Sequence, residues 1–123
     1  MRFERAMLFV VDLRRMEAFC RDVMGLQPIE ATRAEDWVEF ETDGGASFAL
    51  HAIPAHIAAA MVVPSPPVPR EQVSCKLTFT ATDIDVELAR LTGLGVTILH
   101  RPWGGWDAVD PEGNVFGVAA KSG

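Results

Sequence analysis

Several residue types are absent or rare in the sequence, and each absence excludes a kind of chemistry or a class of fold. It has no Tyr, so no phenol can serve as an acid. Its two cysteines, Cys20 and Cys75, lie in segments that read as the core face of a helix and of a strand, where thiols act as small hydrophobes. We therefore expect no disulfide framework.

Positive charge is also scarce. Eleven Lys and Arg stand against seventeen Asp and Glu, for a net charge of −6, which is the wrong sign for binding along phosphates. We expect no nucleic-acid partner. The apolar run from Ala6 to Val11 is far too short to cross a bilayer, and no secretion-like signal opens the sequence. We expect no membrane partner and a cytoplasmic location.

What is present fits a globular α+β domain of 123 residues, 49% of them apolar. Residues 3–11 read as a strand buried on both faces, with Arg5, Met7 and Phe9 on one side. Asp12 is placed to cap a helix that continues to Gly25. Three more strands are predicted, at 27–31, 37–42 and 47–53, with a turn at 43–45 between the last two.

The same order of elements then returns. A linker at 54–72 begins with an Ala-rich stretch suited to a short helical turn, and its Pro-rich middle cannot continue a helix or a sheet. After it come a strand at 73–81, a helix capped by Asp83 and ended at 93–95, and strands at 96–99, 106–109 and 115–119. Trp37 is matched by Trp106 in this repeat. We predict two tandem βαβββ modules, 1–53 and 73–120, within one domain of residues 1–123.

Two segments carry a family resemblance. Residues 12–26 (DLRRMEAFCRDVMGL) are similar to the opening signature of the vicinal oxygen chelate superfamily, the glyoxalase/bleomycin resistance protein/dioxygenase proteins, with Cys20 where a Tyr is usual. Residues 110–116 (DPEGNVF) look like the hairpin that leads into the last strand of that superfamily. The resemblance implies a curved, cup-like mixed sheet with helices on its outer face, a ligand on the concave face, and a homodimer.

The resemblance also implies where a metal would bind. Metal-using members take one ligand from the first strand and one from the last strand of each module, and those positions here are Arg5, Ala49, Lys76 and Gly117. Two of these side chains are cations and two have no donor atom, so we expect no metal and no cofactor. A displaced site at His51 or His100 is the alternative.

The cations and the tryptophans each leave two interpretations open. Arg5 and Lys76 should point into the cup, where either Glu39 or Glu41 of a neighbouring strand or an anionic ligand would balance their charge. Trp103 and Trp106 flank two glycines in a turn-like segment, and they would either stack on a ligand or anchor a dimer interface. If the protein is an enzyme, its general acid/base candidates are His51, His100, Glu39 and Asp107.

The sequence thus predicts a metal-independent protein that binds a small molecule, either a drug or a metabolite. The alternative is a lyase, isomerase or oxidoreductase of the glyoxalase/dioxygenase type with a relocated divalent metal. The candidate ligand-binding residues are Arg5, Met7, Phe9, Trp37, Glu39, His51, Lys76, Trp103 and Trp106.

Overall fold

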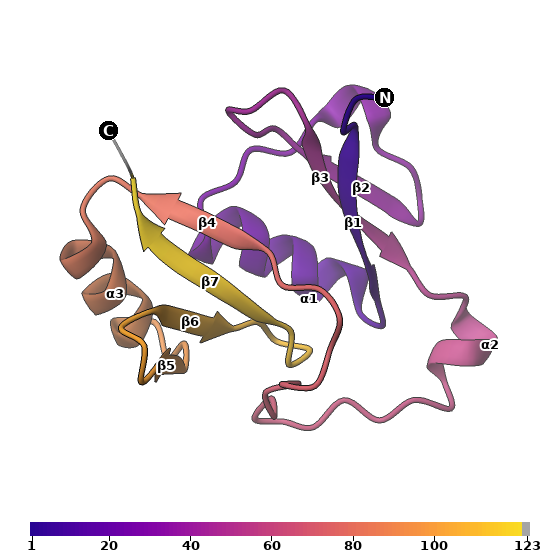
Figure 1. Ribbon diagram of the computed structural model, residues 1–123. Helices are drawn as coiled ribbons and strands as arrows, with labels where there is room; N and C mark the ends of the chain where they lie inside the picture. Colours follow the sequence, from indigo (N-terminus) through magenta and orange to yellow (C-terminus); the bar gives the residue numbers. More distant parts are fainter. Residues whose placement is uncertain (122–123) are drawn as a thin grey trace. The chain divides into compact units, whose positions relative to one another are not determined.

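The computed structural model, shown in Figure 1, describes residues 1–121 and divides the chain into two units, 1–63 and 64–123. Each unit contains a mixed sheet and at least one helix, so the predicted α+β fold of two modules is confirmed. Among residues 1–121, no helix has the length and apolar character needed to span a membrane.

Unit 1 is built on three strands, β1 (Arg5–Val10), β2 (Trp37–Phe40) and β3 (Ser47–Ala52). The order is β1-β3-β2, with the central β3 parallel to β1 and antiparallel to β2. Helix α1 (Leu13–Ala18) continues into a π-helical turn, η1 (Phe19–Val23), and a short helix, α2 (Ala55–Ala58), forms in the Ala-rich stretch. The Asp12 carboxylate accepts a hydrogen bond from the Arg15 amide, which confirms the predicted helix cap.

The core of unit 1 lies on one face of its sheet. Side chains alternate along a strand, and α1 packs against β3. The buried residues of this side are Val10, Met16, Phe19, Cys20, Val38, Phe40, Phe48 and Leu50. The other face of β1 is open, because Met7 is 38% and Phe9 59% exposed. The prediction that β1 is buried on both faces is therefore wrong within this chain.

The predicted strand at 27–31 does not form. Its backbone runs antiparallel to β2 for a short distance, with the Ile29 amide donating to the Glu39 carbonyl and the Glu41 amide to the Gln27 carbonyl. Pro28 has no amide hydrogen to extend this pairing, and a 3₁₀ turn, η2 (Glu30–Thr32), follows at once.

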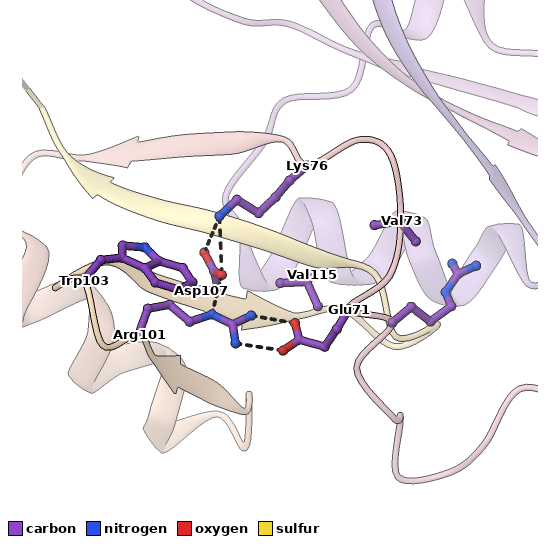
Figure 2. Close-up of a pocket in the computed structure, with 8 residues that line it drawn as sticks. Glu71, Val73, Lys76, Arg101, Trp103, Asp107 and Val115 are labelled. Atoms are coloured by element: carbon purple, nitrogen blue, oxygen red, sulfur yellow. Dashed lines mark hydrogen bonds and ion pairs between the residues drawn. The ribbon is translucent and has the colours of Figure 1, made fainter.

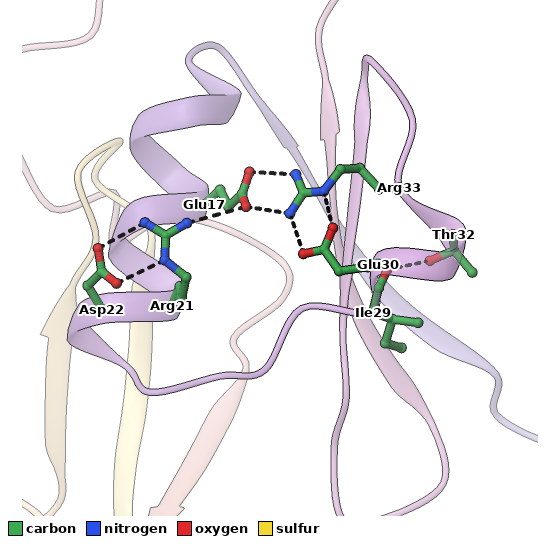
Figure 3. A network of polar contacts seen from close by, with 7 residues as sticks. All are labelled: Glu17, Arg21, Asp22, Ile29, Glu30, Thr32 and Arg33. Atoms are coloured by element: carbon green, nitrogen blue, oxygen red, sulfur yellow. Dashed lines mark hydrogen bonds and ion pairs between the residues drawn. The ribbon is translucent and has the colours of Figure 1, made fainter.

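A network of ion pairs holds this 3₁₀ turn against the helix, as Figure 3 shows. The Arg33 guanidinium donates to both Glu17 oxygens, at 2.9 and 2.7 Å, and to Glu30 at 2.7 and 3.0 Å. Arg21 contacts the same Glu17 at 3.5 Å. The hydrogen bonds from Arg33 lower the pKa of Glu17, so this carboxylate stays charged at neutral pH.

Unit 2 repeats the arrangement with four strands. These are β4 (Thr78–Ala81), β5 (Ile98–His100), β6 (Trp106–Val109) and β7 (Val115–Ala120), in the order β4-β7-β6-β5. Strand β4 is parallel to β7, and the other two pairings are antiparallel. Helix α3 (Ile84–Gly93) packs against this sheet, and the Asp83 carboxylate caps it through the Val86 amide.

Two details of the predicted second module are wrong. The strand predicted at 73–81 is shorter than expected: β4 begins at Thr78, where its pairing with β7 begins opposite Gly117. Cys75 therefore precedes the strand and is exposed instead of facing the core. The second detail is the match between Trp37 and Trp106. Trp37 pairs with His51, two residues beyond Ala49, whereas Trp106 pairs with Val118, one residue beyond Gly117.

The hairpin between β6 and β7 binds the end of the linker. One Asp110 oxygen accepts hydrogen bonds from the amides of Glu112 and Asn114, both at 2.9 Å. The Gly113 carbonyl accepts the Arg70 amide at 2.8 Å, and the Arg70 guanidinium donates to the Asn114 side chain. Gly113 has φ +85°, and a Cβ there would collide with the Val68 carbonyl oxygen. Only glycine fits this close approach without strain.

We expect Gly113→Ala to destabilise the protein by about 2–5 kcal/mol, since it adds a collision to the strain of a positive φ. Gly45→Ala is the matched control, because Gly45 has the same φ of +85° with no atom within 4 Å of the added Cβ. The control should lose about 1–2 kcal/mol. Urea unfolding measures the stability of both variants. Equal losses of stability would show that the close contact between Gly113 and the linker does not add to the cost of the substitution.

Candidate functional site

The predicted ligand residues of unit 1 share one sheet face. The strand register pairs Arg5 with Ser47, Met7 with Ala49 and Phe9 with His51, while β2 pairs Trp37 with His51 and Glu39 with Ala49. Residues that are paired directly across strands lie on the same face. This face therefore carries Arg5, Met7, Phe9, Trp37, Glu39 and His51, opposite the face that packs on α1.

An ion pair anchors one end of this face. The Arg5 Nε donates to Glu39 Oε2 at 3.1 Å and to Ser47 Oγ at 3.1 Å, and the Ser47 hydroxyl donates to the same Glu39 oxygen. Glu39 is 7% exposed. The hydrogen bond from Ser47, helped by Arg5, lowers the pKa of Glu39, so its carboxylate is held charged and is a weak proton acceptor at neutral pH.

Aromatic rings occupy the rest of the face. The His51 ring lies 5.6 Å from Phe9 and 5.8 Å from Trp37, the latter edge-on. The Arg5 guanidinium lies 5.3 Å from the centre of the Trp37 ring, within cation–π range. The His51 Nε2 is 3.2 Å from a carboxylate oxygen of Asp36. The result is a sheet face with the Arg5–Ser47 pairing at one end and the rings of Phe9, His51 and Trp37 at the other.

Unit 2 repeats the ion pair at equivalent positions. Arg5 and Lys76 each lie seven residues before a helix cap, and Glu39 and Asp107 are paired with Ala49 and Gly117. The Lys76 Nζ lies 3.2 Å from Asp107 Oδ1, and Asp107 is 3% exposed. Arg5 thus takes one of the two internal partners expected for it, whereas Lys76 takes a carboxylate that was not expected.

A second cation, Arg101, joins the Lys76–Asp107 pair in unit 2, as Figure 2 shows. The Arg101 Nε donates to Asp107 Oδ2 at 2.8 Å, and its two terminal nitrogens donate to Glu71 at 2.8 and 2.6 Å. The hydrogen bonds from Arg101 lower the pKa of Glu71. The guanidinium also lies 5.9 Å from the centre of the Trp103 ring.

These residues surround a pocket of about 310 Å³ that lies wholly within unit 2. Its lining residues are Arg70, Glu71, Val73, Lys76, Arg101, Trp103, Asp107 and Val115. The volume is at the lower end of the range for small-molecule sites. Trp103 is 73% exposed and stands at the rim, as expected for a ring in a turn, so the structure brings Lys76 and Trp103 to one pocket.

Trp106 is separated from this pocket. Asp107 faces it, so its neighbour Trp106 projects from the opposite side of β6, where its ring stacks on His100 at 4.2 Å. Sequence reasoning missed Arg70, Glu71 and Arg101. Arg101 could have been found from the alternation of side chains along a strand. Leu99 pairs with Asp107, and Arg101, two residues further on, donates its amide to the Gly105 carbonyl, so Arg101 lies on the same side as Asp107. No sequence signal places the linker residues beside it.

The four positions that would hold a metal ion by family resemblance carry residues that cannot bind one in this protein. The Arg5 and Lys76 side chains are cations already bound to Glu39 and Asp107, and Ala49 has no donor. Gly117 cannot be replaced by a ligand without rearrangement, since a Cβ there would lie 2.6 Å from Thr78 Oγ1. Within residues 1–121, no three His, Cys, Asp or Glu side chains gather as a metal-binding group.

We expect Glu39→Gln to destabilise the protein by about 1–3 kcal/mol at pH 7, because it removes the charge that Arg5 and Ser47 bind. The folded-state pKa of Glu39 is lowered, so its stabilisation is present above the unfolded glutamate pKa of about 4.3 and is lost as pH falls through the folded value. The difference in unfolding free energy between the variant and the wild type should therefore become smaller at acidic pH. Urea unfolding at pH 7 and at about pH 3 measures it.

The exposed Glu41→Gln is the control, and it should change stability by less than about 0.5 kcal/mol. If the difference in unfolding free energy between Glu39→Gln and the wild type is the same at both pH values, Glu39 is not charged in the folded protein.

Solved structures with similar folds span nearly the whole chain. A lactoylglutathione lyase from Agrobacterium tumefaciens is 24% identical, with a TM-score of 0.62, over 95% of this chain and 91% of that one. A protein of unknown function from A. tumefaciens str. C58 is 26% identical, with a TM-score of 0.69, over 98% and 95%. A glyoxalase/dioxygenase from Nostoc punctiforme is 16% identical, with a TM-score of 0.71, over 98% and 92%.

No curated protein sequence matches the chain. The family described as glyoxalase-like domain matches residues 6–119, which include every strand of both sheets except the first residue of β1 and the last of β7. The fold and this match agree. The chain belongs to the glyoxalase-like domain family.

Proposed function

We propose that this protein binds a small molecule without a metal ion, in the manner of the bleomycin-resistance type within its family. One observation carries the proposal. In each unit, the position where the family resemblance puts the first metal ligand carries a cation bound to a buried carboxylate of the sheet. These cations are Arg5 in β1 and Lys76, two residues before β4. A positive charge that belongs to the chain thus takes the place of the metal's charge.

The surfaces around these cations support ligand binding. In unit 1, the exposed Met7 and Phe9 and the Trp37 ring offer apolar area beside Arg5. In unit 2, the pocket sets the exposed Trp103 beside Lys76. Exposed rings beside polar groups of fixed position are typical of small-molecule sites. The ligand is a drug or a metabolite, and the proposal includes action as a cytoplasmic homodimer.

An enzyme of the glyoxalase/dioxygenase type is the second candidate. The name of the A. tumefaciens lyase and the pairing of His51 with Asp36 on an exposed sheet face favour it, since an imidazole and a carboxylate are both metal donors. A relocated ion at His51 would need further donors beyond Asp36 for a complete coordination sphere. His100 is a poorer candidate, because it stacks on Trp106 and lies on the side of β5 away from Asp107.

We expect the purified protein to hold no stoichiometric divalent metal and to bind ligands equally well with and without EDTA. The measurement combines elemental analysis with tryptophan fluorescence during titration with planar aromatic drugs, bleomycin-like cations and small carboxylates. A saturable change that survives EDTA supports metal-free binding. A stoichiometric ion, or binding that disappears with EDTA and returns with added metal, would favour the second candidate.

Two variants locate the binding surface. Arg5→Ala tests the face of unit 1, and Trp103→Ala tests the pocket of unit 2. Each variant should lower the affinity for ligands that bind at its surface by about tenfold. Arg2→Ala is the matched control for Arg5→Ala, because Arg2 is exposed and precedes β1. It should leave binding unchanged. Equal effects of the two arginine variants would show that Arg5 acts through net charge alone.

A further inference from the structure

The outer edge of Arg101 is a carboxylate-binding fork that already contains a carboxylate. Its two terminal nitrogens bind the two oxygens of Glu71 at 2.8 and 2.6 Å, which is the parallel geometry that a guanidinium offers to a carboxylate. The inner nitrogen of Arg101 binds Asp107, whose side chain is 4% exposed. Asp107 therefore fixes the fork in place, whichever carboxylate occupies its outer edge.

Glu71 is the replaceable member of this cluster. Its side chain is 50% exposed, against 16% for Arg101. It belongs to the stretch between Arg70 and Thr78, which contains no regular helix or strand. A glutamate that leaves the fork for water regains full solvation, so its release has a small cost compared with that of a buried ion.

The charges that line the pocket favour an anion. Three cations, Arg70, Lys76 and Arg101, line the pocket, against two carboxylates, Glu71 and Asp107. The Lys76 side chain is 44% exposed and its ammonium has three N–H groups, of which Asp107 takes at most two. When Glu71 leaves, the surplus of positive charge increases, and an incoming carboxylate restores the balance.

The rim of the pocket favours an aromatic ring. Trp103 is 73% exposed, and its ring lies 5.9 Å from the Arg101 guanidinium. Gly105 permits this position, because a Cβ there would lie 3.0 Å from the indole Nε1. Trp103 and Glu71 lie on opposite sides of the Arg101 guanidinium in Figure 2, so a flat ring laid on this indole must extend past Arg101 to bring a carboxyl substituent to the fork.

We propose that the pocket of unit 2 binds a planar aromatic carboxylate, whose carboxyl group displaces Glu71 from Arg101 while its ring stacks on Trp103. Glu71 is then an internal competitor that fills the site in the ligand-free protein. This inference rests on the proposed binding function and adds the chemical class of the ligand and the residue that competes with it.

The test is calorimetric titration of the full chain with 2-naphthoate, with 2-naphthamide as the uncharged analogue and acetate as the carboxylate without a ring. Glu71→Gln removes the competing charge and should tighten 2-naphthoate binding by about tenfold, a change of about 1.4 kcal/mol. Asp85→Asn is the matched control: it removes one negative charge from an exposed site on α3 and should leave the affinity unchanged. Trp103→Ala should weaken 2-naphthoate binding in the Glu71→Gln background by about tenfold.

Several results would overturn the inference. Among them are equal or weaker 2-naphthoate binding by Glu71→Gln, an equal gain by Asp85→Asn, and affinity for 2-naphthamide or acetate that matches that for 2-naphthoate. Absence of 2-naphthoate binding by both wild type and Glu71→Gln would also overturn it. If other drugs still bind without metal, the proposed function stands and this inference alone fails; if nothing binds, both fail.

Discussion

A buried carboxylate paired with a cation at or just before the first strand is the interaction on which both units depend. Glu39 and Asp107 are 7% and 3% exposed, and they pair across strands with Ala49 of β3 and Gly117 of β7. A carboxylate removed from water destabilises a fold by several kcal/mol unless a counter-charge and hydrogen bonds compensate it. Arg5 supplies that charge for Glu39, and Lys76 and Arg101 supply it for Asp107.

The surroundings of this repeated ion pair differ between the two units. Around the Arg5–Glu39 pair, Met7 and His51 cover the sheet with apolar and aromatic surface. The positions equivalent to these two are Thr78 and Ala119, neither of which is aromatic. Here Arg101 of the β5–β6 hairpin binds both Asp107 and Glu71 of the linker. One repeated pair thus supports an aromatic face in unit 1 and a polar pocket in unit 2.

Much of this could be predicted from sequence, because it follows from local spacing. The two helix caps, the hairpins and the shared face of Arg5, Met7 and Phe9 depend on short-range periodicity. The failures come from effects that spacing does not show. Pro28 stops a strand that its neighbours favour, and a register offset of one residue puts Trp106 on the opposite face from that expected. The ion pair between Arg101 and Glu71 joins positions 30 apart.

The path of the linker explains why the pocket exists at all. Asp110 organises the β6–β7 hairpin by accepting amide hydrogen bonds from Glu112 and Asn114, and burial raises its own pKa. The hairpin then binds the backbone of Arg70 through Gly113. Because Glu71 is the next residue, that hydrogen bond delivers its carboxylate to Arg101. The segment 110–116 that carries the family resemblance therefore also positions one wall of the pocket and the carboxylate that fills it.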